Sequence, residues 1–265
     1  DYAEGKGSEY VSPEAAQYYT TGGYYYPYGP QKNENRLLTL YANYNKFVDT
    51  LNSSFDATVG YDYQYWKSAT PATTQMNAAG EIQTQYRASD QRHVLLSYYG
   101  RLNYSYGSRY MLTATVRRDA TSRFAQSQRW GTFPSVALGW RVTEESFMKD
   151  QQVLSNLKLR ASYGVTGQQD GIGNYNYLPV YTISQDGAQG IVGGTPIYTY
   201  RPEAYVSDLK WETTKQTDIG IDLSVLGGRI SLVADYYYKK TVDLHYDKIL
   251  PYYTGYSSQT QNIGS

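Results

Sequence analysis

The segment Leu96–Val116, which reads LSYYGRLNYSYGSRYMLTATV, decides the fold of this chain. Its large apolar side chains recur at every second position on both sides of Gly107 and Ser108. Successive side chains of an extended strand point to opposite faces, so this period of two predicts two β-strands with one apolar face each. Gly107 and Ser108 suit the positive φ angles of a two-residue turn, so the segment is predicted to form a hairpin.

The same alternation continues along most of the chain from about residue 36. Phe55–Tyr65 and Ile230–Tyr238 are clear examples. The pattern predicts eight strands, roughly at residues 36–48, 53–66, 91–106, 109–119, 133–143, 156–166, 211–226 and 229–243. We therefore expect an all-β fold, an antiparallel up-and-down meander of about eight long strands.

The predicted strands are about 10–16 residues long, whereas strands of globular proteins usually have about 5–6 residues and membrane-crossing strands about 9–11. Short and long connections also alternate. The short ones lie near residues 49–52, 107–108 and 227–228, with an intermediate one at 144–155, and the long ones near 67–90, 120–132, 167–210 and 244–261. All long loops would then lie at one end of the sheet, as in outer-membrane β-barrels. A soluble β-sandwich remains the alternative.

Composition excludes several classes of protein. The chain has 24 basic and 24 acidic residues, two histidines and no cysteine. Without cysteine there is no disulfide framework, thiol catalysis or thiolate zinc site. Balanced charge without a basic block argues against a nucleic-acid partner. No run of 18 apolar residues predicts a transmembrane helix, and the mean hydropathy of −0.63 is compatible with alternating strands.

Charged residues gather on the polar face of the predicted strands. They are Arg101, Arg117, Arg141, Arg160, Asp218, Asp222 and Asp235. Charges on one wall of a sheet require water or opposite charges nearby, so this wall is expected to face a hydrated lumen or a docked polar domain. The solvent face of an open sheet is the alternative. The other face is apolar and carries Tyr and Trp near strand ends, including Trp211, which is typical of aromatic belts at membrane interfaces.

Tyrosine is unusually frequent, with 33 residues, and many tyrosines fall in predicted loops. Aromatic faces beside amides suit sugar rings or peptide backbones, although a protein interface is enriched in the same residues. The candidate substrate or lid contacts are Tyr24, Tyr25, Tyr26, Tyr28, Tyr175, Tyr177, Tyr198 and Tyr200.

Patterns that indicate catalysis are weak. Glu144 and Glu145 are adjacent, and adjacent residues do not face each other on a helical turn. His93 and His245 without cysteine make a poor metal site, and no Gly-x-Ser-x-Gly sequence occurs. We predict no catalytic, cofactor-binding or metal-binding residues, no cofactor and no enzymatic activity.

Several blocks of sequence resemble one family in the order in which they occur. They are 99–106 (YGRLNYSY), 109–119 (RYMLTATVRRD), 122–124 (SRF), 130–141 (WGTFPSVALGWR), 145–148 (ESFM), 157–168 (LKLRASYGVTGQ), 211–220 (WETTKQTDIG) and 235–241 (DYYYKKT). Together they resemble the barrel of SusC/RagA-like TonB-dependent outer-membrane transporters. The resemblance covers roughly residues 91–265, and residues 1–90 carry no family signature.

This resemblance implies a barrel of about 22 strands around a plug domain, in the bacterial outer membrane. It also implies import of oligosaccharides or peptides, energy from the TonB complex through an N-terminal region, a SusD-like surface lipoprotein as lid, and contact with outer-membrane lipid. We find no signal peptide or plug domain in the sequence, so we expect residues 1–265 to be an internal part of the barrel domain. Within it, 1–35 is predicted as a long extracellular-type loop and 36–265 as strands and loops.

Two other interpretations remain open at this point. One is a soluble carbohydrate-binding β-sandwich, in which the tyrosine-rich loops bind the ligand. The other is a small eight-stranded outer-membrane barrel that acts as an adhesin or structural protein.

Overall fold

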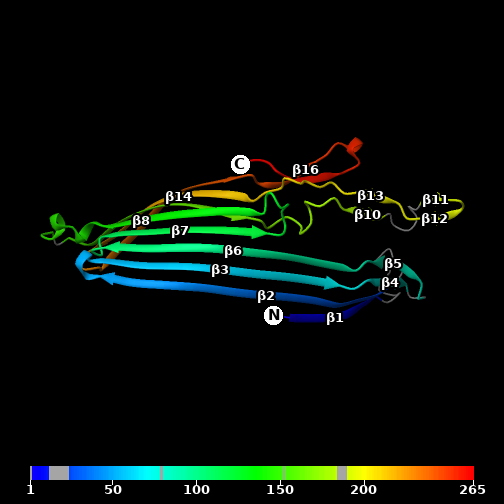
Figure 1. Ribbon diagram of the computed structural model, residues 1–265, viewed down its shortest axis with the longest axis horizontal. Helices are drawn as coiled ribbons and strands as arrows, with labels where there is room; N and C mark the ends of the chain where they lie inside the picture. Colours follow the sequence, from blue (N-terminus) through cyan, green and yellow to red (C-terminus); the bar gives the residue numbers. More distant parts are fainter. Residues whose placement is uncertain (1, 12–23, 78–79, 152, 184–189) are drawn as a thin grey trace. The chain divides into compact units, whose positions relative to one another are not determined.

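The protein consists of antiparallel β-strands and short 3₁₀ turns (Figure 1). The computed structural model describes residues 2–11, 24–77, 80–151, 153–183 and 190–265. No helix within these ranges is long and apolar enough to cross a membrane.

Eight long strands appear where the alternation predicts them. They are β2 (Tyr24–Val48), β3 (Ser53–Thr70), β6 (Ser89–Tyr106), β7 (Tyr110–Thr121), β8 (Trp130–Arg141), β9 (Leu154–Gln168), β14 (Glu212–Val225) and β15 (Ile230–Val242). They lie in one sheet in the order β15-β14-β9-β8-β7-β6-β3-β2, so each strand is hydrogen-bonded to its neighbours in the series (Figure 1). The predicted up-and-down meander is confirmed.

The cross-strand register separates two faces of this sheet. One row joins Leu138, Ala161, Ile219 and Tyr236 across β8, β9, β14 and β15. We call the surface that contains this row the apolar face. The next row joins Gly139, Arg160, Gly220 and Asp235. The surface that contains this second row is the polar face.

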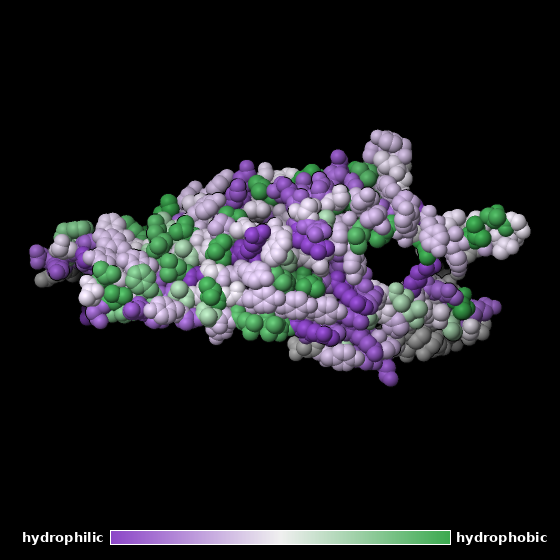
Figure 2. Space-filling model, in the orientation of Figure 1, coloured by the Kyte–Doolittle hydropathy of each residue, from purple (hydrophilic) through white to green (hydrophobic). Residues whose placement is uncertain are grey.

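Large apolar side chains lie at the surface of the sheet, and Figure 2 shows hydrophobic residues as green patches on the face in view. Leu138 is 56% exposed, Ile219 59% and Tyr236 72%. A contiguous exposed apolar surface of this kind marks contact with a membrane or another protein. The fully buried side chains of the described strands are few, because the strands form a wall rather than two packed layers.

The predicted short turns have the expected backbone conformations. Gly107 and Ser108 both have a φ of 55°, and the β14–β15 turn has positive φ at Leu226, Gly227 and Gly228. Positive φ at both central residues gives the two-residue turn a twist that matches the flanking strands. The β2–β3 turn contains η2 (Asp49–Leu51) and the β8–β9 turn contains η3 (Val142–Glu144) and η4 (Ser146–Met148).

Glu145 joins the β8–β9 turn to the strand ends beside it. Its carboxylate accepts hydrogen bonds from the Tyr110 hydroxyl at 2.5 Å and the Trp140 indole at 3.0 Å, and Arg109 lies 3.2 Å away. The Tyr110 and Trp140 hydrogen bonds and the Arg109 charge hold the pKa of Glu145 below its usual range. Glu145 therefore holds the turn against the ends of β7 and β8.

The chain divides into two compact units, residues 1–38 with 62–95 and residues 39–61 with 96–265. In the first unit, the described residues of 1–35 form strands rather than the predicted loop. β1 (Tyr2–Val11) pairs with the beginning of β2, from Tyr2↔Glu34 to Val11↔Tyr24, with a register shift between Gly5 and Gly7. The pairing with β1 and the high strand propensity of tyrosine favour the extended conformation of this stretch.

The long connections contain short hairpins that the alternation does not reveal. β4 (Thr73–Asn77) pairs with β5 (Ile82–Tyr86) in the first unit. In the second unit the pairs are β10 (Tyr181–Ile183) with β13 (Tyr200–Pro202), β11 (Gly190–Val192) with β12 (Thr195–Ile197), and β16 (His245–Ile249) with β17 (Ser258–Asn262), the last flanking η5 (Tyr252–Thr254).

Candidate functional site

Arg160 is the centre of an ion-pair cluster on the polar face. Its Nη2 atom lies 2.9 Å from Oδ1 of Asp222 and 2.8 Å from Oδ1 of Asp235, and its Nε donates to Asp222 at 3.1 Å. Gly220 of β14 lies in register between Arg160 of β9 and Asp235 of β15. A Cβ at Gly220 would clash with the Asp235 carboxylate and would lie 2.7 Å from Arg160 Nη2. Glycine therefore leaves the space in which the three charges meet.

The other predicted polar-face residues lie elsewhere, on β6, β7, β8 and β14. Arg117 pairs with Asp119 at 2.8 Å and donates to the fully buried Ser97 at 2.8 Å. Arg141, the last residue of β8, lies 3.9 Å from Glu144 in the β8–β9 turn. Asp218 is opposite Ser162 of β9 and Tyr237 of β15, and Arg101 is exposed on β6. The structure thus brings Arg160, Asp222 and Asp235 together and distributes the rest over neighbouring strands.

A polar cluster that the sequence analysis missed surrounds Asp56 of β3. Its carboxylate accepts hydrogen bonds from Asn43 and Asn45 of β2 and from Asn103 of β6, at 3.3–3.5 Å. Thr113 of β7 donates to Asn103 at 2.9 Å, so the hydrogen bonds cross four strands. The alternation placed Asp56 on the polar side of its strand. Its hydrogen-bond partners on β2 and β6 could be identified only from the pairing of these strands in the structure.

A shallow hollow of about 310 Å³ lies on the second unit between these charged clusters. Its floor is made of small residues, among them Ser135, Ala137, Ser162 and Gly164, and Gln216 lies at its edge. Because these side chains are short, hydroxyl and backbone groups are accessible there. The polar face therefore combines charges, amides and hydroxyls, which can bind polar groups.

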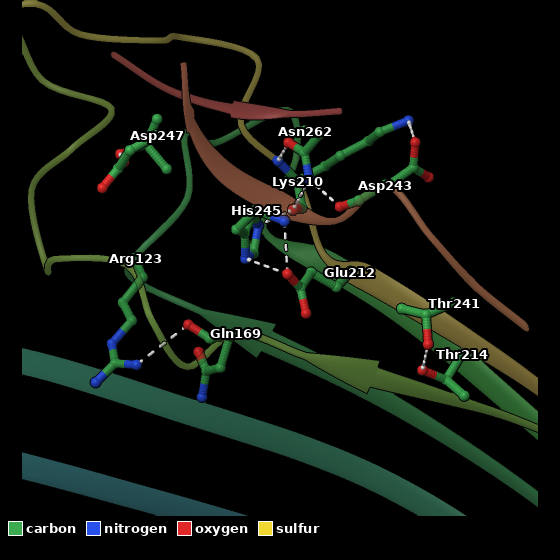
Figure 3. A network of polar contacts seen from close by, with 11 residues as sticks. Arg123, Gln169, Lys210, Glu212, Thr214, Thr241, Asp243, His245, Asp247 and Asn262 are labelled. Atoms are coloured by element: carbon green, nitrogen blue, oxygen red, sulfur yellow. Dashed lines mark hydrogen bonds and ion pairs between the residues drawn. The ribbon is translucent and has the colours of Figure 1, made fainter. Parts of the chain in front are cut away.

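The bases of the long loops in the second unit are joined by the hydrogen bonds drawn in Figure 3. His245 of β16 is 4% exposed at its side chain, and its Nε2 donates to the Lys210 carbonyl at 2.7 Å. Its backbone amide donates to Glu212 at 2.5 Å. Asn262 of β17 donates to the carbonyls of Lys210 and Asp243 at 2.8 and 2.7 Å (Figure 3). The β16–β17 hairpin is thus attached to the start of β14.

A small aromatic core lies beside this network. Phe124 is 0% exposed, and its ring centroid is 5.4 Å from that of Trp211, which also contacts Phe133 at 5.3 Å. The Trp211 indole donates to the Arg129 carbonyl at 3.0 Å. Trp211 was predicted to lie in an interfacial belt, and this prediction is wrong because β14 begins only at Glu212, so the strand alternation does not extend to it.

The candidate loop tyrosines do not converge on one described site. Tyr24, Tyr25, Tyr26 and Tyr28 belong to β2, and their side chains lie outside the described part of the structure. In the second unit, the other candidates differ in exposure. Tyr175 and Tyr177 are half-buried, whereas Tyr198 and Tyr200 are 47% and 65% exposed.

The first unit contains a cleft of about 690 Å³ that the sequence did not reveal. Its lining includes Glu4 and Lys6 of β1, Gln31 of β2, Tyr86 of β5 and Arg87. Strands β1, β2, β4 and β5 bring these side chains together, and no local pattern in the sequence indicates that pairing. Amides, charges and one tyrosine in an open cleft suit a polar ligand.

An antiparallel meander with one apolar and one polar face is the arrangement expected of a transmembrane β-barrel wall. The family model described as "TonB dependent receptor-like, beta-barrel" matches residues 4–265. The chain therefore belongs to the TonB-dependent receptor β-barrel family, and its strands are part of an outer-membrane barrel.

Curated relatives and solved structures agree with this assignment. TonB-dependent receptor SusC of Bacteroides thetaiotaomicron is 40% identical over all of this chain and 27% of that protein. TonB-dependent receptor P3 of Formosa agariphila is 35% identical over 87% of this chain and 24% of that protein. The RagAB peptide transporter matches with a TM-score of 0.81 and 24% identity, covering 97% of this chain and 29% of the other. The chain thus spans about a quarter of the length of these curated relatives.

Proposed function

We propose that the chain is part of the barrel wall of an outer-membrane importer that takes up oligosaccharides or peptides. The observation that carries this proposal is the continuous separation of the two faces across β8, β9, β14 and β15. The row Leu138–Ala161–Ile219–Tyr236 contacts lipid, while the row with Arg160 and Asp235 faces the lumen. A wall of this kind excludes lipid from a hydrated path and leaves charges to contact what lies inside it.

The seven polar-face residues are proposed to contact the lumen and a plug domain. Arg160, Asp222 and Asp235 satisfy one another partly, but all three side chains keep between about a quarter and two fifths of their surface exposed. They therefore retain hydrogen-bonding capacity toward a polar domain inside the barrel. The proposed role is binding and passage, with no covalent chemistry.

Partners of the complete receptor follow from its relatives. SusC is named as a TonB-dependent receptor, and RagAB is described as a peptide transporter. For the present protein we accordingly propose the TonB complex as the energy source and a SusD-like surface lipoprotein as the lid. In the first unit, the proposed contacts for substrate or lid are Tyr24, Tyr25, Tyr26 and Tyr28 and the cleft at Glu4 and Tyr86. In the second unit they are Tyr175, Tyr177, Tyr198 and Tyr200.

The test is uptake by cells that carry or lack the full-length receptor. Fluorescein-labelled oligosaccharides and, separately, labelled peptides are supplied with and without a protonophore. Uptake of one class should require the receptor and should stop with the protonophore, because transport through a TonB-dependent receptor draws on the inner-membrane gradient. Receptor-independent uptake of both classes would contradict the proposal.

A variant of the same receptor tests the tyrosines. Tyr24→Ala, Tyr25→Ala and Tyr26→Ala together should weaken substrate capture without lowering barrel stability, because the stacking surface is lost while the wall is intact. Tyr246→Ala with Tyr253→Ala is the control, since these tyrosines are 61% and 88% exposed and belong to another hairpin. Unchanged uptake and affinity in the triple variant would remove these tyrosines from the site.

A further inference from the structure

Two lysines lie directly opposite each other on neighbouring strands. Lys215 of β14 pairs in register with Lys240 of β15, and both are exposed. The register between these strands runs without a shift from Thr213 to Val225, so both lysines share the apolar face with Ile219 and Tyr236. Directly opposed side chains have Cβ atoms about 5 Å apart, so the two ammonium groups can reach the same ligand.

Acidic side chains nearby are directed elsewhere. Among the described residues, neither lysine has an ion pair with a carboxylate. Glu212 contacts His245, Asp243 lies 3.0 Å from Lys210, and Asp218 is on the polar face by alternation. Like charges directly opposite each other destabilise a sheet, so this pair lacks compensation from its own strands.

The lysine pair lies near the long-loop end of the apolar face, one row on that face before Thr213 and Val242. The next row on that face holds Thr217 and Tyr238, followed by Ile219 and Tyr236, with Tyr238 61% and Ile219 59% exposed. Tyrosines at the border of an apolar band lie at the level of lipid headgroups. A lipid bound here would place its acyl chains against Ile219 and its headgroup beside the two ammonium groups.

Arg118 of β7 is a further cation on the apolar face near the long-loop end. It is exposed, and its guanidinium carbon lies 5.1 Å from the ring centroid of Trp130, which is 44% exposed. The alternation along β7 puts Arg118 on the side of Val116 and opposite to Arg117. Basic side chains therefore lie near the long-loop end of the apolar face on β7 as well as on β14 and β15, at the level proposed for lipid headgroups.

We propose that Lys215 and Lys240 bind the phosphate of an anionic lipid in the outer leaflet. The phosphate lies between the two ammonium groups and removes their repulsion, while the acyl chains cover the apolar residues below. A free phosphate ion would satisfy only the charges, and exposed charges are largely screened by salt. Lipid binding here rests on the proposed outward orientation of the apolar face and is independent of which substrate the receptor imports.

The test uses the full-length receptor in nanodiscs. Its Tm is measured in phosphatidylcholine alone and with about one fifth of the lipid replaced by phosphatidylglycerol, because a ligand that binds the folded state raises Tm. The anionic lipid should raise the Tm of the wild type, and Lys215→Gln with Lys240→Gln should remove at least about half of that increase. Lys239→Gln should keep the whole increase, since Lys239 pairs with Gln216 and lies on the polar face.

Phosphatidylcholine alone supplies a second readout. There the double variant should be at least as stable as the wild type, because it has lost the repulsion and the zwitterionic headgroup offers the lysine pair no net negative charge. If the double variant does not fold, Lys240→Gln alone should remove part of the increase. An equal increase in all variants would overturn the proposal, as would an equal increase caused by inorganic phosphate in phosphatidylcholine nanodiscs. Neither result would affect the uptake experiment.

Discussion

At the scale of single residues, the ion pairs on the polar face depend on a glycine as much as on the charged side chains. Arg160 reaches both Asp222 and Asp235 only because Gly220 has no Cβ in the space between them. The alternation identified all three charged residues as members of one face. It did not identify them as partners, because their pairing depends on cross-strand register, which no local pattern in the sequence encodes.

Glu145 gives a prediction for pH. Its folded-state pKa is lowered by the Tyr110 and Trp140 hydrogen bonds and by Arg109, so its contribution to stability is fully present above the unfolded pKa of about 4.3. That contribution is lost as pH falls through the lower folded pKa. The Tm advantage of the wild-type receptor over Glu145→Gln should therefore be largest above about pH 5 and shrink toward about pH 3.

The control for this measurement is Glu144→Gln. Glu144 has 52% of its side chain exposed and lies 3.9 Å from Arg141, so its replacement should change Tm little at any pH. A Tm difference between wild type and Glu145→Gln that stays constant from acidic to neutral pH would show that the carboxylate charge is not what stabilises the turn.

At the scale of elements, the eight long strands were predictable and the loop structure was not. Periodicity of two is a local property, so β3 and β6 through β9 could be located from their own residues. The β1–β2 pairing and the small hairpins depend on contacts between segments, and they were expected to be loops. Trp211 shows the same limit, because its burial against Phe124 joins two connections that are far apart in the sequence.

The aromatic core at the loop bases should be needed for loop order but not for the barrel. Phe124→Ala removes a fully buried ring from its contacts with Trp211 and His245, at a local cost of about 3 kcal/mol. Limited proteolysis of the intact receptor should then cut faster within residues 122–129 and 169–211, while barrel stability stays the same. Phe147→Ala, at a 68% exposed site in the β8–β9 turn, is the control. Equal cleavage rates in both variants would contradict this role of Phe124.

At the scale of the whole molecule, the two faces of the wall serve different environments. We propose that the apolar face and its lysine pair meet lipid and that the polar face meets water and the interior of the barrel. The family assignment and the structure agree on a barrel wall. The soluble sandwich is not favoured, because its core would require a second layer over the exposed Leu138, Ile219 and Tyr236.

The most direct test of this arrangement is the behaviour of the full-length receptor on a denaturing gel after cell fractionation. A closed barrel resists detergent until it is heated, because every strand edge is paired. We predict that the receptor is found in the outer-membrane fraction and migrates differently before and after boiling. A soluble product whose mobility does not change on boiling would contradict the assignment of these strands to a transmembrane barrel.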